Sequence, residues 1–401
     1  MPCFAVTRAN RQFDRVIVII LDGVGIGELP DAGNFGDAGS DSLGNVVTAR
    51  GRLRLPHLAA RGLNRLTRLP GFEETAVTGG YGKLTTTAVG KDSTSGLWEI
   101  AGVVLKKSFP LFPEGFPRDA LEKLRAATDR EFIGNRAASG TRIIAELGEE
   151  HLRTGALILY TSADSVCQIA AHVDVVPLDE LYDVGRKARD TMKRPYAVGR
   201  VIVRPFAGDV GSFYRRNDAR RDYSLPPPAP TLLDELSESG FEVRGVGKVD
   251  DIFADRGFTA CSHTKDNADG VSTVKNELRD EFEGLLFVNL NDTDTLYGHR
   301  NDVVGYARAL EDFDAALPSV ESETDERDLI LILSDHGNDP TTPSTDHSRE
   351  YTPLLAWHRR IGRGVPLGTR ASLADVGQTV AENFAVGPLA AGTSFLNEIS
   401  D

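Results

Sequence analysis

An apolar run in the C-terminal part of the chain constrains the fold most. Residues 329–333 read Leu-Ile-Leu-Ile-Leu, and Ser-Asp-His-Gly follows at once at 334–337. A short, wholly apolar run is typical of a strand buried on both faces of a parallel sheet. Because open α/β sheets bind ligands beyond the carboxyl ends of their strands, Asp335 and His336 are predicted to lie at a site. His347 follows after a loop rich in Pro, Thr and Asp. A buried strand with an ordinary polar turn is the alternative.

Two other apolar runs also end in carboxylates. Residues 16–21 precede Asp22, and residues 284–290 precede a stretch with Asp292 and Asp294. The glycines after Asp22 follow the spacing G-x-G-x-G rather than G-x-G-x-x-G, and no clear helix follows, which argues against a dinucleotide site. Parallel strands end at the same edge of a sheet, so we expect these carboxylates to converge with Asp335.

Histidines in the same segments suggest why carboxylates would gather. His299, His336 and His347 are three of the chain's eight histidines. Clustered carboxylates are costly unless cations neutralise them. Asp and His ligands without thiolates suit two divalent ions such as Mn²⁺, with Zn²⁺ and Mg²⁺ as alternatives. Two such ions about 4 Å apart can stabilise both the attacking and the leaving oxygen of a phosphoryl transfer.

A hydroxyl-rich turn offers the nucleophile for such a transfer. The Ser-Thr-Ser run at 93–95 lies between Lys91-Asp92 and Gly96. Backbone amides in a turn of this kind, or at the start of the next helix, can cradle a phosphate. Coordination to a metal would activate the serine hydroxyl, which is otherwise a poor nucleophile. A turn that merely caps a helix would have the same composition.

Charge and cysteine content exclude several classes of protein. The net charge is −14, from 45 basic and 59 acidic residues, which argues against a nucleic-acid binder. Cys3, Cys167 and Cys261 are widely spaced, so neither a disulfide framework nor a thiolate zinc site is expected. The N-terminus has no apolar signal region, and no run is long enough to span a membrane. We therefore expect a cytoplasmic protein without membrane contact.

The order of strands and helices predicts an α/β core with an inserted domain. Residues 1–105 and 222–401 alternate strands and helices, as in a mostly parallel sheet flanked by helices. Residues 106–221 lack this rhythm and are expected to form an inserted α+β domain. A proline-rich stretch at 225–230 is typical of a stiff hinge.

Three local features of the core are predicted from composition and spacing. Residues 28–50 are rich in Gly, Asp and Asn and indicate a long loop. Helical spacing favours a helix over 55–66. A last helix is expected over 372–384, with Ser372 and Asp375 as a capping box.

Taken together, these segments resemble the phosphopentomutase family, metal-dependent phosphomutases of the alkaline phosphatase superfamily. The resemblance extends over nearly the whole chain. It implies an alkaline-phosphatase-like core with the inserted domain as a cap, and interconversion of pentose 1-phosphates and 5-phosphates, with ribose or 2-deoxyribose as the sugar. The matching segments are Asp22-Gly23-Val24-Gly25, Gly90-Lys91-Asp92, Trp98-Glu99, Tyr160-Thr161-Ser162-Ala163-Asp164-Ser165-Val166, Gly199-Arg200-Val201-Ile202, Gly247-Lys248, Asp251-Ile252-Phe253, Leu296-Tyr297-Gly298-His299-Arg300, Ser334-Asp335-His336-Gly337-Asn338-Asp339-Pro340 and Thr345-Asp346-His347-Ser348-Arg349-Glu350-Tyr351.

The resemblance also implies a role for individual residues. Ser93 would carry the phosphoryl group, with Thr94 as the fallback, and a sugar bisphosphate would prime the enzyme and be its intermediate. Two Mn²⁺ ions would be held, one by Asp22, Asp335 and His336, the other by Asp294, His299 and His347. The substrate-binding positions would be Ser162, Asp164, Arg200, Ile202, Arg220 and Lys248.

Two positions depart from the family pattern. The family usually has Thr where this chain has Ser93, and His where it has Leu97. The alternatives are therefore a phosphatase on the same scaffold, a mutase for a modified pentose phosphate, and a non-catalytic metal-binding protein. A domain that closes over the intermediate and excludes water favours the mutase. The partner is expected to be a small pentose phosphate, and the chain a monomer or small homo-oligomer.

Overall fold

The computed structural model describes residues 11–162 and 165–400, so Asp164 lies outside the described residues. The chain forms two compact units. The core unit comprises Met1–Lys107, Pro227–Asp250 and Asp255–Asp401, and the inserted unit comprises Ser108–Pro226 and Asp251–Ala254. The insertion thus extends past residue 221, because β8 (Arg221–Ser224) pairs with β6 (Arg200–Ala207) of the inserted sheet.

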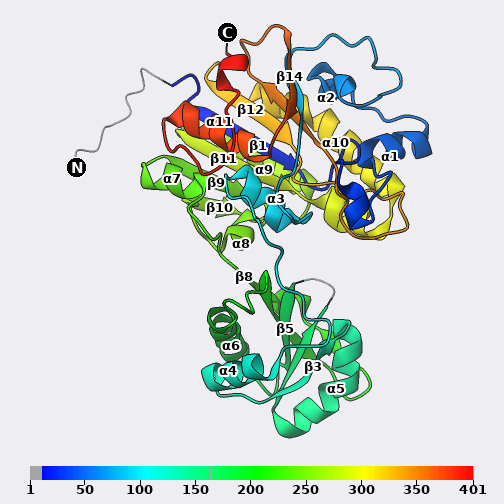
Figure 1. The fold of residues 1–401 in the computed structure, drawn as a ribbon, viewed down its shortest axis with the longest axis vertical. Helices are drawn as coiled ribbons and strands as arrows, with labels where there is room; N and C mark the ends of the chain where they lie inside the picture. Colours follow the sequence, from blue (N-terminus) through cyan, green and yellow to red (C-terminus); the bar gives the residue numbers. More distant parts are fainter. Residues whose placement is uncertain (1–10, 163–164, 401) are drawn as a thin grey trace. The chain divides into compact units, whose positions relative to one another are not determined.

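The core unit is built on an eight-stranded sheet of order β10-β9-β11-β1-β12-β13-β2-β14 (Figure 1). Its centre is β1 (Arg15–Leu21), which is parallel to β11 (Gly284–Leu290) on one side and to β12 (Asp328–Leu333) on the other. Every residue of these three strands is buried, as expected for apolar runs covered on both faces. Their carboxyl ends meet at one edge of the sheet.

The outer strands make the sheet mixed. β9 (Glu242–Val246) and β10 (Ala260–Ser262) continue the parallel part. Beyond β12, β13 (Thr352–Trp357) and β2 (Gly79–Leu84) pair antiparallel, and β14 (Gly364–Arg370) is parallel to β2. The predicted α/β class with a mostly parallel sheet is confirmed.

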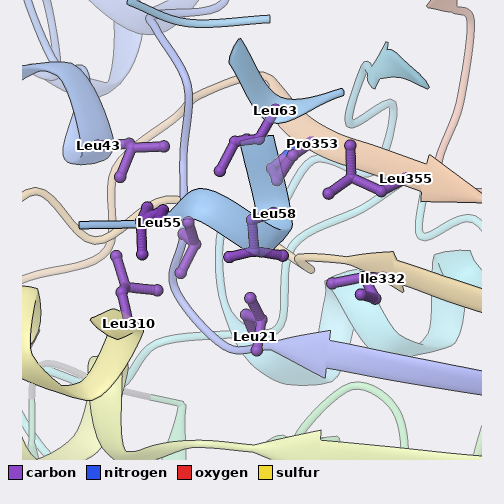
Figure 2. A pocket seen from close by; sticks show the side chains of 10 residues that line it. Leu21, Leu43, Leu55, Leu58, Leu63, Leu310, Ile332, Pro353 and Leu355 are labelled. Carbon is purple, nitrogen blue, oxygen red and sulfur yellow. The ribbon is translucent and has the colours of Figure 1, made fainter. Parts of the chain in front are cut away.

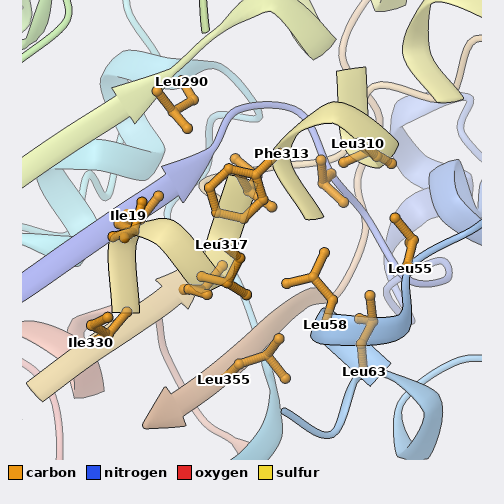
Figure 3. Close-up of a cluster of buried hydrophobic side chains, with 14 of the residues drawn as sticks. Ile19, Leu55, Leu58, Leu63, Leu290, Leu310, Phe313, Leu317, Ile330 and Leu355 are labelled. Carbon is orange, nitrogen blue, oxygen red and sulfur yellow. The ribbon is translucent and has the colours of Figure 1, made fainter. Parts of the chain in front are cut away.

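Helices cover the sheet and bury its apolar side chains. In Figure 3, Ile19, Ile330 and Leu355 of the sheet face Leu317 of α10 and Leu58 of α2. The core helices are α1 (Ser42–Arg50), α2 (Pro56–Ala60), α3 (Ser93–Ile100), α7 (Leu232–Glu238), α9 (Asn267–Arg279), α10 (Val303–Ser322) and α11 (Ala374–Phe384). The short helix α8 (Val249–Phe253) begins in the core unit and ends in the inserted unit.

Three local predictions differ from the structure. The segment 28–50 is not all loop, because it contains α1. The helix expected over 55–66 is interrupted at Gly62, whose φ of 108° ends the first turn before a 3₁₀ turn begins. Ser372 is not the N-cap of the last helix: α11 begins at Ala374 with Leu373 as its N-cap, and the Ser372 hydroxyl donates to Glu99 (2.7 Å) and accepts from the amide of Ala374 (3.1 Å).

A small cavity lies inside the core unit, among α2 and the ends of β1 and β12. Figure 2 shows its lining, which is entirely apolar and includes Leu21, Leu58 and Ile332. Its volume is about 10 Å³. A space of this size without polar partners does not hold an ordered water, so it is a packing gap rather than a ligand site.

The inserted unit has its own six-stranded sheet. The order is β3-β4-β5-β6-β7, with β8 also on β6. Helices α4 and α6 bury one apolar cluster against this sheet, and α5 helps bury a second. The elements not yet bounded are β3 (Phe132–Ala137), β4 (Leu157–Thr161), β5 (Val166–His172), β7 (Tyr214–Arg215), α4 (Arg118–Thr128), α5 (Gly140–Thr154) and α6 (Leu178–Thr191). Across both units, no helix among the described residues has the length and hydropathy to span a membrane.

Candidate metal centre and nucleophile

The three central strands deliver carboxylates to one place. Asp22 follows β1, Asp335 follows β12 after one residue, and Asp294 lies in the π-helical turn η5 (Thr293–Tyr297) beyond β11. Two overlapping groups have ligand atoms within 4.8 Å of one another, and His336 belongs to both. They are Asp22 with Asp335 and His336, and Asp294 with His336 and His347.

The hydroxyl of Ser93 lies beside the first group. His336 Nε2 lies 3.3 Å from Asp22 Oδ1 and 3.3 Å from Asp335 Oδ2. Ser93 Oγ is 3.1 Å from His336 Nε2 and 3.4 Å from Asp22 Oδ1. The hydroxyl predicted as nucleophile therefore lies beside two of the predicted ligands, Asp22 and His336.

The second group is centred on Asp294. Its Oδ1 is 3.5 Å from His347 Nε2. His299 belongs to neither group, but its Nε2 lies 3.3 Å from Asp294 Oδ2. Asp294 is buried, whereas His299 and His347 are partly exposed. All six predicted ligands thus lie in one continuous cluster.

The three histidines all direct Nε2 into this cluster. His336 Nδ1 lies 3.0 Å from the carbonyl of Gly337, and His299 Nδ1 lies 2.7 Å from the carbonyl of Thr345. His347 Nδ1 is 3.4 Å from Asp346 Oδ1. An acceptor beside Nδ1 fixes the proton there and leaves Nε2 as the ligand atom, an arrangement common around protein-bound metals.

Electrostatics also indicate a cation site. Burial and the neighbouring Asp22 raise the pKa of Asp335 to about 8. Burial alone would lower the pKa of His336, but the Asp335 and Asp22 carboxylates outweigh it and raise that pKa well above its usual value. The hydrogen bond that His299 donates to the Asp294 carboxylate raises the pKa of His299 to about 9. Divalent cations would replace the protons that otherwise balance this charge.

Donor chemistry and orphaned atoms fit two such cations. The cluster offers three carboxylates and three imidazoles and no thiolate, which suits hard or borderline divalent ions. Asp335 Oδ2 is buried and has no hydrogen-bond partner among the described residues, although a buried polar atom normally has one. A metal ion at this place would satisfy it.

Two asparagines that the sequence did not single out orient the carboxylates. Asn289 Nδ2 donates to Asp22 Oδ2 (2.8 Å), and Asn338 Nδ2 donates to Asp294 Oδ1 (2.7 Å). Asp292, which the sequence placed with Asp294, turns away and accepts from the amide of Asn267 (2.9 Å). Only Asp294 of that pair reaches the cluster.

The nucleophile segment begins a helix, so the turn does cap one. Asp92 is the N-cap of α3 and forms a capping box with Ser95, whose hydroxyl donates to the Asp92 carboxylate and carbonyl. That use of Ser95 leaves Ser93, at the first helical position, with its hydroxyl toward the cluster. No hydrogen bond in the described part of the chain joins Thr94 to a predicted ligand. Leu97, at the second departure from the family pattern, is fully buried.

The predicted sugar and phosphate contacts divide between the units. In the inserted unit, Arg200 and Arg220 both approach Asp222, at 3.6 Å for Arg200 and 2.6 Å for Arg220 Nε. Ile202 is opposite Asp222 in the β6–β8 pair and is buried. Ser162 is partly exposed in the inserted unit, and Lys248 is exposed in the core unit.

The inserted unit also brings two further arginines, Arg204 and Arg215, close to the predicted contact Arg220. The charges of Arg204, Arg215 and Arg220 act together on the phenol of Tyr160, whose pKa is raised by its burial. Arg204 Nε donates to Gln168 of the neighbouring strand (2.7 Å). Long-range strand pairing brings these arginines together, and neither spacing nor motif reveals it.

Comparison with known proteins places the chain in a family. The model of the Metalloenzyme superfamily matches residues 14–388. Phosphopentomutase of Dictyoglomus turgidum is 51% identical over 386 residues, which cover 96% of this chain and 98% of that protein. Phosphopentomutases of Acetivibrio thermocellus and Clostridium novyi are each 49% identical, over 96% and 97% of this chain and 99% and 100% of their own. The chain therefore belongs to the phosphopentomutase family of the Metalloenzyme superfamily and is an isomerase.

Proposed function

We propose that this enzyme interconverts the 1-phosphate and 5-phosphate of ribose or 2-deoxyribose through a phosphoserine at Ser93. The observation that carries the proposal is the position of Ser93 Oγ, 3.1 Å from His336 Nε2 and 3.4 Å from Asp22 Oδ1 within the cluster of six predicted ligands. Relatives of about the same length that are named phosphopentomutase support it.

We propose two divalent ions, preferably Mn²⁺, at the cluster. When bound, they would supply positive charge that favours the deprotonated hydroxyl and stabilises the transferring phosphoryl group. One would be held by Asp22, Asp335 and His336, and the other by Asp294, His299 and His347.

The chain's own groups would position the phosphoryl group. Ser93 would attack it, and the amides at the start of α3 would donate to its oxygens, as helix N-termini do for phosphates. Asn289 and Asn338 would keep Asp22 and Asp294 in place. Each acceptor beside a histidine Nδ1 would hold Nε2 toward the cluster.

A mutase must return the phosphate to the other end of the same sugar. Ser93 would give its phosphate to a pentose monophosphate, and the resulting bisphosphate would turn around and return its other phosphate to Ser93. A sugar bisphosphate would also prime the enzyme. The inserted unit would act as a cap that excludes water during this turn. Contacts to the sugar and the distal phosphate would come from Ser162, Asp164, Arg200, Ile202, Arg220 and Lys248.

The cysteines bear on the cellular compartment of the enzyme. Cys167 and Cys261 are free thiols, which suits a reducing compartment such as the cytoplasm. We propose a small pentose phosphate as the partner, and a monomer or small homo-oligomer as the working form.

The decisive assay uses metal-loaded, bisphosphate-primed protein with ribose 5-phosphate. Ribose 1-phosphate without free phosphate is the expected product. Ser93→Ala should abolish turnover and leave the metal content intact. Ser93→Thr and Thr94→Ala should retain turnover. Free phosphate as the main product would indicate a phosphatase, and turnover of only a modified pentose phosphate would indicate a specialised mutase. If neither product forms, the protein is a binding protein. An active Ser93→Ala would move the nucleophile to Thr94 or Ser95.

A further inference from the structure

Arg349 lies in the core unit and holds the segment that leads to Ser93. Its guanidinium donates to the carbonyls of Ala88 (2.7 Å) and Gly90 (2.9 Å) through Nη1, and to that of Thr86 (3.1 Å) through Nη2. The remaining donors, on Nε and Nη2, reach the carboxylate of Asp31 at 3.1–3.3 Å. Three alternate carbonyls of one short segment thus converge on a single side chain.

All five N–H donors of this guanidinium are used. The side chain is buried, and it also lies over the ring of Phe35, 4.8 Å from the centroid. A lysine ammonium at this position has three donors and no planar fork, so it cannot serve three carbonyls and a carboxylate together. The position therefore demands an arginine.

The same segment is held from its other side by the nucleophile helix. Glu99 of α3 is fully buried and accepts from the amide of Ala88 (2.7 Å) and from the amide and hydroxyl of Thr87 (2.9 and 2.7 Å). Carbonyls are therefore held by Arg349 and amides by Glu99. The backbone between them has little freedom to move before it enters α3.

Arg349 is also close in sequence to a predicted metal ligand. It follows His347 by two residues, and its own amide donates to Asp37 Oδ2 (2.9 Å). Asp37 in turn pairs with Lys91, which lies two residues before Ser93 (3.0 Å). One residue therefore connects the strand-exit loop that carries His347 with the segment that carries Ser93.

We infer that Arg349 is a positioning residue that sets Ser93 against the metal cluster. It touches neither substrate nor the reacting atoms in this role. The inference rests on the proposed function for its effect on catalysis, but the ordering of residues 86–90 by Arg349 does not depend on it.

The test compares Arg349→Lys with Arg15→Lys. Arg15 is a matched control, because it is another buried arginine with a two-point contact to a carboxylate (Asp328) and bonds to two carbonyls (Leu278 and Asp280), at the opposite end of β1. Arg349→Lys should lower kcat about 10- to 100-fold, as a small misplacement of a reacting group does, with KM changed less than about threefold. Bound metal per chain should not change. Arg15→Lys should keep the wild-type kcat at a comparable loss in Tm.

Hydrogen exchange in the same proteins gives a readout independent of activity. The Thr87 and Ala88 amides should exchange faster in Arg349→Lys than in wild type, and at the wild-type rate in Arg15→Lys. Should Arg349→Lys not fold, Glu99→Gln loosens the segment from the other side and should lower kcat at least about fivefold, with faster exchange at Ala88. Wild-type kcat in either variant, or lost kcat with unchanged exchange, would overturn the inference. An inactive wild type would instead overturn the proposed function, and the exchange comparison would still decide whether Arg349 orders the segment.

Discussion

At the scale of single residues, Gly96 allows helix α3, which carries the proposed nucleophile, to lie directly against Asp335. A Cβ atom at position 96 would be 2.5 Å from the Asp335 carbonyl oxygen and 2.8 Å from the Asp335 Cβ. Gly96→Ala should therefore push α3 and Asp335 apart, at a cost of about 1–3 kcal/mol in stability from overpacking. We expect a lower kcat and weaker metal binding, because Ser93 and Asp335 lose their relative position.

Metal titration calorimetry and steady-state kinetics on Gly96→Ala would check this. Gly33→Ala is the control, because position 33 is exposed, its φ is not positive, and a Cβ there would have no atom within 4 Å. Wild-type metal affinity and kcat in Gly96→Ala would show that the close approach has no role in the site.

The carboxylates predicted from sequence each follow an apolar run, and the residues that were missed do not. Asp22, Asp294 and Asp335 could be found because each follows a buried apolar run. Asn289 carried a weak signal, as the polar residue inside the otherwise apolar strand Gly284–Leu290. Arg349 lies in the matching segment 345–351 but had no predicted role, because neither its burial nor its three carbonyl partners can be read from neighbours in the chain.

At the scale of elements, His151 links α5 as a neutral ring to the end of β5 and to the residue before β4. Its Nδ1 lies 2.7 Å from the carbonyl of Ala156, and its Nε2 accepts from the amide of His172 (2.9 Å). Burial lowers the pKa of His151. In the unfolded chain the His pKa is about 6.5, so the unfolded chain binds a proton at a higher pH than the folded chain does. Stability therefore falls as pH drops below about 6.5, by at most ~1.4 kcal/mol per pH unit.

Urea unfolding at pH 8 and pH 5.5 would measure this contribution. In His151→Leu the carbonyl of Ala156 and the amide of His172 lose their partner, so the variant should be about 1–3 kcal/mol less stable at pH 8. Its further loss on acidification should be smaller than that of the wild type, because the titrating ring is gone. An equal loss in both proteins would contradict the assignment.

Elements were predictable where one local pattern dominated. The strands β1, β11 and β12 were found because wholly apolar runs have few other solutions. Helix α1 was missed because Gly, Asp and Asn surround it, although Leu43, Val46 and Val47 have helical spacing and are buried. The capping box at Ser372 did not form, because the N-cap of the helix lies one residue later than predicted, at Leu373, and the Asp375 amide donates to the Ser372 carbonyl instead of its hydroxyl.

At the scale of the molecule, the sequence predicted an α/β core and a separate inserted domain, since their rhythms of strand and helix differ. It could not place the boundary, because the pairing of β8 with β6 is a long-range contact. All six predicted metal ligands lie in the core unit, at residues 22–347 outside the insertion. Metal binding should therefore act on the stability of the core unit and leave the exchange protection of the inserted sheet unchanged.

Asp335 determines how the stability of the metal-free core unit changes with pH. Its pKa in the folded chain, about 8, lies above the unfolded value, so the metal-free protein loses stability as pH rises from about 4 through 8. Asp335→Asn removes this charge and should make the metal-free chain more stable than the wild type at pH 8. Mn²⁺ at about 100 times its Kd should stabilise the wild type by about 2.7 kcal/mol and the variant by less. Asp335→Asn should thus be more stable than the wild type in urea unfolding with EDTA, and less stable than the wild type in urea unfolding with Mn²⁺. A carboxylate that binds the ion in the folded chain must make Mn²⁺ stabilise the wild type more than Asp335→Asn. Equal stabilisation of both proteins by Mn²⁺ would therefore show that Asp335 is not a ligand.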